Sequence, residues 1–170
     1  QDLLFANRSF TGLLWQDEIC NGTEPSLLDP ACSTIQDTWD GKLNPDSQGV
    51  ALFREALSPI KQLLTDNGGL IQLDNNGDPK RNPDGSLVTE AMFSTAYDPA
   101  DPINTPRGLT PIGRQTLQGS LAKAVQELGT ANLPLDAPLG DLQFTRKGDE
   151  VIPIHGGLQK IDGAYHKVEY

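Results

Sequence analysis

The chain has 170 residues, enough for one domain or for a substantial part of a larger one. Its formal net charge of −10 argues against a nucleic-acid surface, because phosphate binding needs clustered lysine and arginine side chains. No apolar run approaches the ~20 residues that span a bilayer, and we expect no membrane partner. The chain begins at Gln1 rather than Met, which indicates a processed or truncated product, so the lack of a signal peptide says nothing about the compartment.

Residues 1–69 are predicted to be mostly helical. The segment 33–39 has the spacing of a short helix, and a longer helix follows with Ser47 as its expected N-cap. Pro59 should kink this second helix or mark a new first turn, because proline lacks the N–H that helix interiors need. The Asn-Gly-Gly sequence at 67–69 is expected to end it.

Residues 70–109 are predicted to form a hairpin and an extended loop. Short apolar runs at 70–73 and 86–88 flank the turn-rich segments 74–79 and 82–85, so a hairpin with an elaborate surface loop is expected. The segment 97–107 carries three prolines and is expected to be an extended connection.

Residues 110–129 give the clearest helix in the chain. Thr110 is the expected N-cap, Pro111 fits the first turn, and Gly129 is expected to end the helix. One stripe of this helix is apolar and should belong to the core, and it comprises Leu117, Leu121, Ala124, Val125 and Leu128.

Residues 130–170 are predicted to be rich in β-structure. Leu142 and Phe144 alternate with polar residues, the segment 147–149 supplies a turn, and a second apolar run covers 151–154. This pattern predicts a second hairpin. The fold class is therefore α+β, predominantly helical with one or two short β-hairpins.

No catalytic, cofactor or metal site can be assembled from the sequence. The acidic loop at 74–78 has oxygen ligands at alternate positions, but its spacing departs from the calcium-binding EF-hand loop, and turn-forming Asp and Asn side chains explain it without a metal. His155 and His166 are the only histidines, and neither has a zinc-ligand spacing or a serine in a recognisable nucleophile motif. We interpret His155 as a structural residue at the end of a strand.

Cys20 and Cys32 are the only cysteines, with eleven residues between them. A disulfide closing this loop would stabilise the protein by roughly 3 kcal/mol in the loop-entropy model and would imply an oxidising compartment. Two unpaired buried thiols are the alternative.

Several short motifs occur in the order found in the β-chain of the penicillin acylase family, and the chain most resembles the acyl-homoserine lactone acylases of that family. The block from Gly140 to Gln143, followed by Gly156-Gly157, resembles the "W-G-D-L-Q … G-G" segment late in that β-chain. The other landmarks are Leu3–Asn7, Thr38–Gly41 with Gly49 and Phe53–Glu55, and Asn104–Leu109. Related acylases also carry a close pair of cysteines at this place, which favours the Cys20–Cys32 disulfide.

The resemblance implies that the chain is the C-terminal part of a β-chain, a fragment of a larger αββα N-terminal-nucleophile hydrolase. In that family the N-terminal serine of the β-chain attacks the amide carbonyl with its own α-amine as base, and backbone amide and asparagine groups hold the oxyanion. These groups and the family's calcium ligands lie upstream of the matched region. No catalytic residue, cofactor or metal is therefore assigned to this chain, and the isolated segment is expected to be inactive.

The expected function is that of a scaffold segment in a periplasmic or secreted acylase that removes an acyl group from a homoserine lactone, a β-lactam or a lipopeptide. Its expected partners are the rest of the β-chain and the α-chain, with self-association through exposed strand edges as a further expectation. The alternative is a secreted acidic binding or interaction module without catalysis. Cooperative unfolding of the chain on its own distinguishes this alternative.

Overall fold

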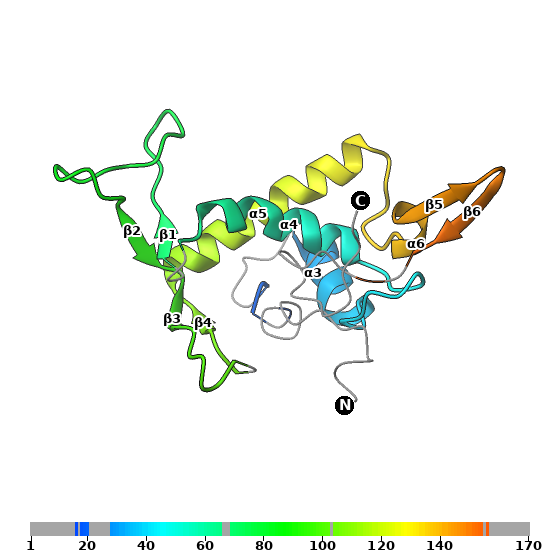
Figure 1. The fold of residues 1–170 in the computed structure, drawn as a ribbon, viewed down its shortest axis with the longest axis horizontal. Coiled ribbons are helices and arrows are strands. Elements are labelled where there is room, and N and C mark those ends of the chain that lie inside the picture. The colour runs from blue at the N-terminus through cyan, green and yellow to red at the C-terminus, as the bar shows by residue number, and fades with distance from the viewer. Residues whose placement is uncertain are drawn as a thin grey trace.

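The computed structural model describes residues 16, 18–20, 28–65, 69–102, 104–154 and 156. Two long helices, α4 and α5, lie side by side, with strands β1–β4 at one end of the pair and the hairpin β5–β6 at the other (Figure 1). The elements are α3 (Asp29–Ser33), the π-helix η1 (Thr34–Thr38), α4 (Val50–Leu63), β1 (Gly69–Ile71), β2 (Thr89–Ala91), β3 (Phe93–Thr95), β4 (Arg107–Leu109), α5 (Pro111–Thr130), α6 (Leu139–Leu142), β5 (Phe144–Lys147) and β6 (Glu150–Pro153). The α+β class is confirmed.

The core lies along the line where α4 packs against α5. Phe53 and Leu57 of α4 and Leu117 and Leu121 of α5 are fully buried. The hydroxyl of Ser120 donates a hydrogen bond of 2.6 Å to the carbonyl of Ala56, which links the two helices directly. The apolar stripe predicted for α5 is confirmed as core at Leu117, Leu121, Ala124 and Leu128, and Val125 is partly buried against it.

Helix α5 begins as the sequence predicts. Thr110 is its N-cap, and the Thr110 side chain accepts a hydrogen bond of 3.1 Å from the N–H of Gly113. The same hydroxyl donates to the carbonyl of Ala91 at 2.7 Å, so that the cap also ties α5 to β2. The helix ends at Thr130, one residue beyond the predicted Gly129.

Helix α4 differs from its prediction at both ends. Its N-cap is Gly49, with φ of 78°, and Ser47 instead donates its hydroxyl to Asp40 at 3.0 Å and accepts from the N–H of Asn44 at 3.2 Å. Pro59 lies inside the helix, which continues without interruption to Leu63. The helix ends before the predicted stop at 67–69, because Leu64 is already extended and forms a bridge with Leu70.

Three antiparallel strand pairs are present in the described residues, where one or two hairpins were expected. The predicted hairpin in the middle of the chain is β1–β2. In the long loop that joins its strands, one isolated bridge pairs Leu73 with Pro79 and another pairs Arg81 with Leu87, and each closes one of the two turn-rich segments. The unexpected pair is β3–β4, in which Phe93 pairs with Leu109 across the proline-rich connection. Its strands have three residues each, too short for an alternating pattern to show in the sequence.

The predicted C-terminal hairpin is confirmed as β5–β6, but it begins later than expected. Leu142 belongs to the short helix α6 and not to a strand, so that β5 starts at Phe144. Gly140 in α6 lies so close to Pro45 and Pro153 that a Cβ atom would stand 2.9 Å from the Pro45 carbonyl oxygen and 3.1 Å from the Pro153 Cβ. The N–H of Gln143 donates to the carbonyl of Leu139 at 2.8 Å, which closes the turn of α6, and the N–H of Gly140 donates to the carbonyl of Pro45 at 2.7 Å. In the described residues no helix is both long and apolar enough to cross a membrane.

Two glycines of α5 test how closely the start of this helix packs against Met92. A Cβ at Gly113 would clash with the backbone carbonyl of Met92, whereas a Cβ at Gly119 meets nothing within 4 Å. We expect Gly113→Ala to lower the free energy of unfolding by about 2 kcal/mol. Gly119→Ala should raise it by up to about 1 kcal/mol through helix propensity. Urea unfolding followed by circular dichroism measures both, and equal effects at the two positions would contradict the described packing of α5.

Candidate functional site

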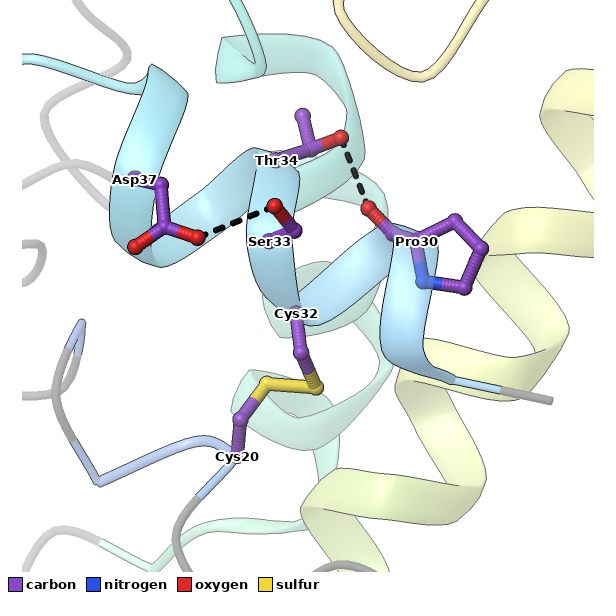
Figure 2. The surroundings of a disulfide bond; sticks show 6 residues. All are labelled: Cys20, Pro30, Cys32, Ser33, Thr34 and Asp37. Atoms are coloured by element: carbon purple, nitrogen blue, oxygen red, sulfur yellow. Dashed lines mark hydrogen bonds between the residues drawn. A yellow bond between two sulfur atoms is a disulfide. The ribbon is translucent and has the colours of Figure 1, made fainter. Parts of the chain in front are cut away.

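A disulfide joins Cys20 to Cys32 of α3, as favoured by the resemblance (Figure 2). Both cysteines are buried, each with 8% exposure. Two residues before Cys20, the carboxylate of Glu18 accepts hydrogen bonds from the N–H groups of Gly108 at 2.9 Å and Leu109 at 2.8 Å. The segment around Cys20 is therefore held to α3 by a covalent bond and to β4 by a carboxylate.

The main buried polar cluster surrounds Gln143, which follows α6 and is 3% exposed. Its side-chain oxygen accepts from Nη1 of Arg54 at 3.1 Å, and its Nε2 donates to the carbonyls of Ile154 at 2.8 Å and Gly156 at 3.0 Å. We call Arg54, Gln143 and Gly156 the Gln143 junction. Every polar atom of the Gln143 amide has a partner, as buried polar groups require.

The Gln143 junction connects three parts of the chain. Arg54 projects from α4 and donates through Nη2 to the carbonyl of Gly156 at 3.3 Å. The N–H of Gly156 in turn donates to the carbonyl of the fully buried Leu43 at 2.9 Å. The Arg54 guanidinium thus holds the base of the β5–β6 hairpin against α4. Through its N–H, Gly156 also connects this base to the loop before α4, where Leu43 lies.

A groove of about 600 Å³ lies beside the Gln143 junction, between α4, the end of α5 and α6. Its lining is mixed: Ala51, Arg54, Glu55, Ser58, Glu127, Leu128, Ala131, Leu133, Leu139, Leu142 and Gln143. Ser58 is the one hydroxyl group among these residues, and Glu55 and Glu127 are the carboxylates that share the lining with it. In the described residues no hydrogen bond joins Ser58 to either carboxylate. The groove has the composition of a packing or binding surface.

The acidic loop at 74–78 is explained by turn chemistry. Asp74 Oδ1 accepts hydrogen bonds from the N–H groups of Asn76 at 2.8 Å and Asp78 at 3.0 Å. These backbone donors, that of Asp78 foremost, hold the pKa of the Asp74 carboxyl below its usual value. Because this oxygen is engaged by the chain itself, the loop forms an Asx turn as expected. Among the described residues, no three Asp, Glu, His or Cys side chains gather as metal ligands would.

His155 and His166 lie outside the described residues, so the interpretation of His155 as structural stays a prediction.

The sequence of this chain is similar to those of known proteins. The family described as penicillin amidase matches residues 2–169, nearly the whole chain. The chain belongs to the penicillin amidase family. It is 34% identical over 153 residues to the acyl-homoserine lactone acylase PvdQ of Pseudomonas fluorescens, covering 87% of this chain and 16% of that protein. The PvdQ acylase of Pseudomonas syringae pathovar syringae is 26% identical over 152 residues, with the same coverage. The chain thus spans only 16% of the length of these curated relatives.

The landmarks that carry the resemblance to penicillin amidases make structural contacts. Trp39 packs on Phe53 of α4, with ring centroids 4.4 Å apart, and donates its indole N–H to the carbonyl of Lys42 at 2.9 Å. Gly108 and Leu109 donate to Glu18, as described above, and Gln143 forms the junction with Arg54. The structural roles of Arg54 and Gln143 were missed at the sequence level, although both residues belong to the motifs that carry the family resemblance. The available signal was a long polar side chain directly beside an apolar residue in each motif.

Removal of the disulfide should destabilise the chain. In the loop-entropy model, the double variant Cys20→Ser, Cys32→Ser loses roughly 3 kcal/mol of unfolding free energy. Wild-type protein in a strong reductant should unfold at the same denaturant concentration as the variant. An unchanged midpoint in both samples would contradict a stabilising role of this bond.

Replacement of Gln143 tests the junction. Gln143→Leu removes three side-chain hydrogen bonds and leaves the Arg54 guanidinium without this acceptor. We expect a loss of about 3 kcal/mol in unfolding free energy. The matched control is Gln115→Leu on the exposed face of α5, which should change stability by no more than about 0.5 kcal/mol. Similar losses at both glutamines would show that the junction contributes nothing specific.

Proposed function

We propose that this chain is a scaffold segment of an exported acylase, whose reacting groups come from another part of the protein. The complete protein hydrolyses the amide bond between an acyl chain and homoserine lactone, with β-lactams and lipopeptides as further candidate substrates. Water is added across the C–N bond, giving a carboxylic acid and the free amine of the lactone. The observation that carries this proposal is the match to acyl-homoserine lactone acylases over 87% of the chain.

The scaffold role is supported by what the described polar groups do. Glu18, Gln143 and Arg54 each use their hydrogen-bonding atoms on backbone or side-chain partners within the chain. In the groove beside the junction, no hydrogen bond among the described residues joins Ser58 to Glu55 or Glu127, whereas a serine nucleophile needs a base within hydrogen-bond reach. These groups position helices and strands, and none is arranged to attack a carbonyl.

The proposed compartment is the periplasm or the exterior of the cell. A buried disulfide between Cys20 and Cys32 supports an oxidising environment, where such bonds persist. The proposed partners are the rest of the β-chain and the α-chain of the acylase. This is supported by the small share of its relatives' length that the chain covers.

An activity comparison tests both halves of the proposal. The complete protein that contains this chain and the isolated chain of residues 1–170 are incubated at equal molar concentration with an acyl-homoserine lactone. Released homoserine lactone is measured by mass spectrometry. We expect release by the complete protein and none above the buffer level by the isolated chain.

The two possible contradictions are separate. Hydrolysis by residues 1–170 alone would contradict the scaffold role, whereas a complete protein inactive on acyl-homoserine lactones, β-lactams and lipopeptides would contradict the acylase. A urea titration of the isolated chain distinguishes the binding-module alternative. A self-contained module unfolds in one cooperative transition as a stable monomer, whereas a scaffold segment that needs its partners is marginally stable or self-associates.

A further inference from the structure

The β5–β6 hairpin projects from α6 away from the long helices α4 and α5, at the end of the molecule opposite β1–β4 (Figure 1). All eight of its residues are exposed. Three large apolar side chains are among them, with exposed fractions of 38% for Phe144, 46% for Val151 and 37% for Ile152. A lone two-stranded hairpin is marginally stable in water, so this one needs a partner to cover it.

The pairing of the two strands fixes which backbone groups point outward. Ile154 donates its N–H to the carbonyl of Gln143 at 2.8 Å, which marks these two residues as a hydrogen-bonded pair. Hydrogen-bonded and non-hydrogen-bonded pairs alternate along an antiparallel ladder. The pairs Phe144–Pro153 and Arg146–Val151 are therefore of the second kind, and their N–H and C=O groups point away from the hairpin.

The two outer edges are not equivalent. On β5, Phe144 and Arg146 both present a complete N–H and C=O set. On β6, only Val151 does so, because Pro153 has no N–H to donate. Proline on an edge strand is a common protection against unwanted pairing. The outer edge of β5 is thus the one suited to accept another strand.

The side chains support the same conclusion. Paired residues of an antiparallel ladder share a face, so Phe144 and Val151 lie on one face and Ile152 lies on the other. An added strand continues both faces and can bring apolar side chains beside each of them. The guanidinium of Arg146, 5.4 Å from the Phe144 ring centroid, covers only part of the first face.

We propose that β5 is a docking edge, which pairs through Phe144 and Arg146 with an extended segment of the same acylase outside residues 1–170. The inference rests on the proposed function, since it takes the chain to be part of a larger protein. The occupant follows from length: the chain covers 16% of its relatives, so most of such a protein is available on the same molecule. A strand tethered in this way has a far higher effective concentration than a second copy.

Hydrogen exchange in the complete acylase tests the pairing directly. The N–H groups of Phe144, Arg146 and Val151 all point outward from the hairpin, so that Val151 is an internal control. We expect exchange at Phe144 and Arg146 to be at least about tenfold slower than at Val151, because only the β5 edge is hydrogen-bonded to a neighbour. NMR or fragmentation mass spectrometry resolves the three sites.

Proline substitution in the complete acylase gives a second test. Arg146→Pro and Val151→Pro each remove one outward N–H from opposite members of the same residue pair. Arg146→Ala controls for the loss of the guanidinium, because it keeps the N–H. We expect the fall in thermal midpoint caused by Arg146→Pro to be more than twice the fall caused by either of the other two variants.

The outcomes that overturn the proposal differ from those that overturn the acylase function. Equal exchange at the three sites, protection at Val151 instead, or protection that disappears on dilution would each overturn it, the last by identifying a second copy as the partner. Equal thermal shifts for the two proline variants would also overturn it. Hydrolysis of an acyl-homoserine lactone by the same wild-type sample reports separately on the function.

Discussion

The packing of α4 on α5 is the interaction on which the rest of the structure depends. Phe53 of α4 is central to this packing, because it is fully buried in the core and its ring also contacts the ring of Trp39. The strand pairs and α6 are each too short to be stable alone and are fixed by their attachment to these helices. Thr110 attaches β2 to the start of α5, and Arg54 attaches the β5–β6 hairpin to α4.

Elements with strong local signals could be predicted from the sequence. Helix α5 has its cap, its first-turn proline and its apolar stripe all within twenty residues, and its start was found to the residue. The turns around Asp74 and of the C-terminal hairpin were found for the same reason, since turn residues act on their immediate neighbours. Family membership was also accessible, because the order of several short motifs adds specificity that no single motif has.

Features that depend on distant parts of the chain were missed. Ser47 looks like a helix cap locally, but its hydroxyl is taken by Asp40, and Gly49 supplies the turn into α4. Leu142 alternates like a strand residue, yet it belongs to α6, whose Gly140 donates its N–H to the carbonyl of Pro45 far earlier in the chain. The partners of Gln143 are 89 and 13 residues away, at Arg54 and Gly156, so that no local pattern could reveal the junction.

The hydrogen bonds of Gly156 have a consequence for how the chain folds. They connect it to Arg54, 102 positions earlier, and to Leu43, which lies still further back. Contacts between residues so far apart in sequence are slow to form, because a long loop must close before they contribute. During synthesis α4 leaves the ribosome long before Gly156 does, so these contacts cannot form until most of the chain has been made. We therefore expect the junction to close late in folding, and the β5–β6 hairpin gains its attachment to Arg54 only at that point.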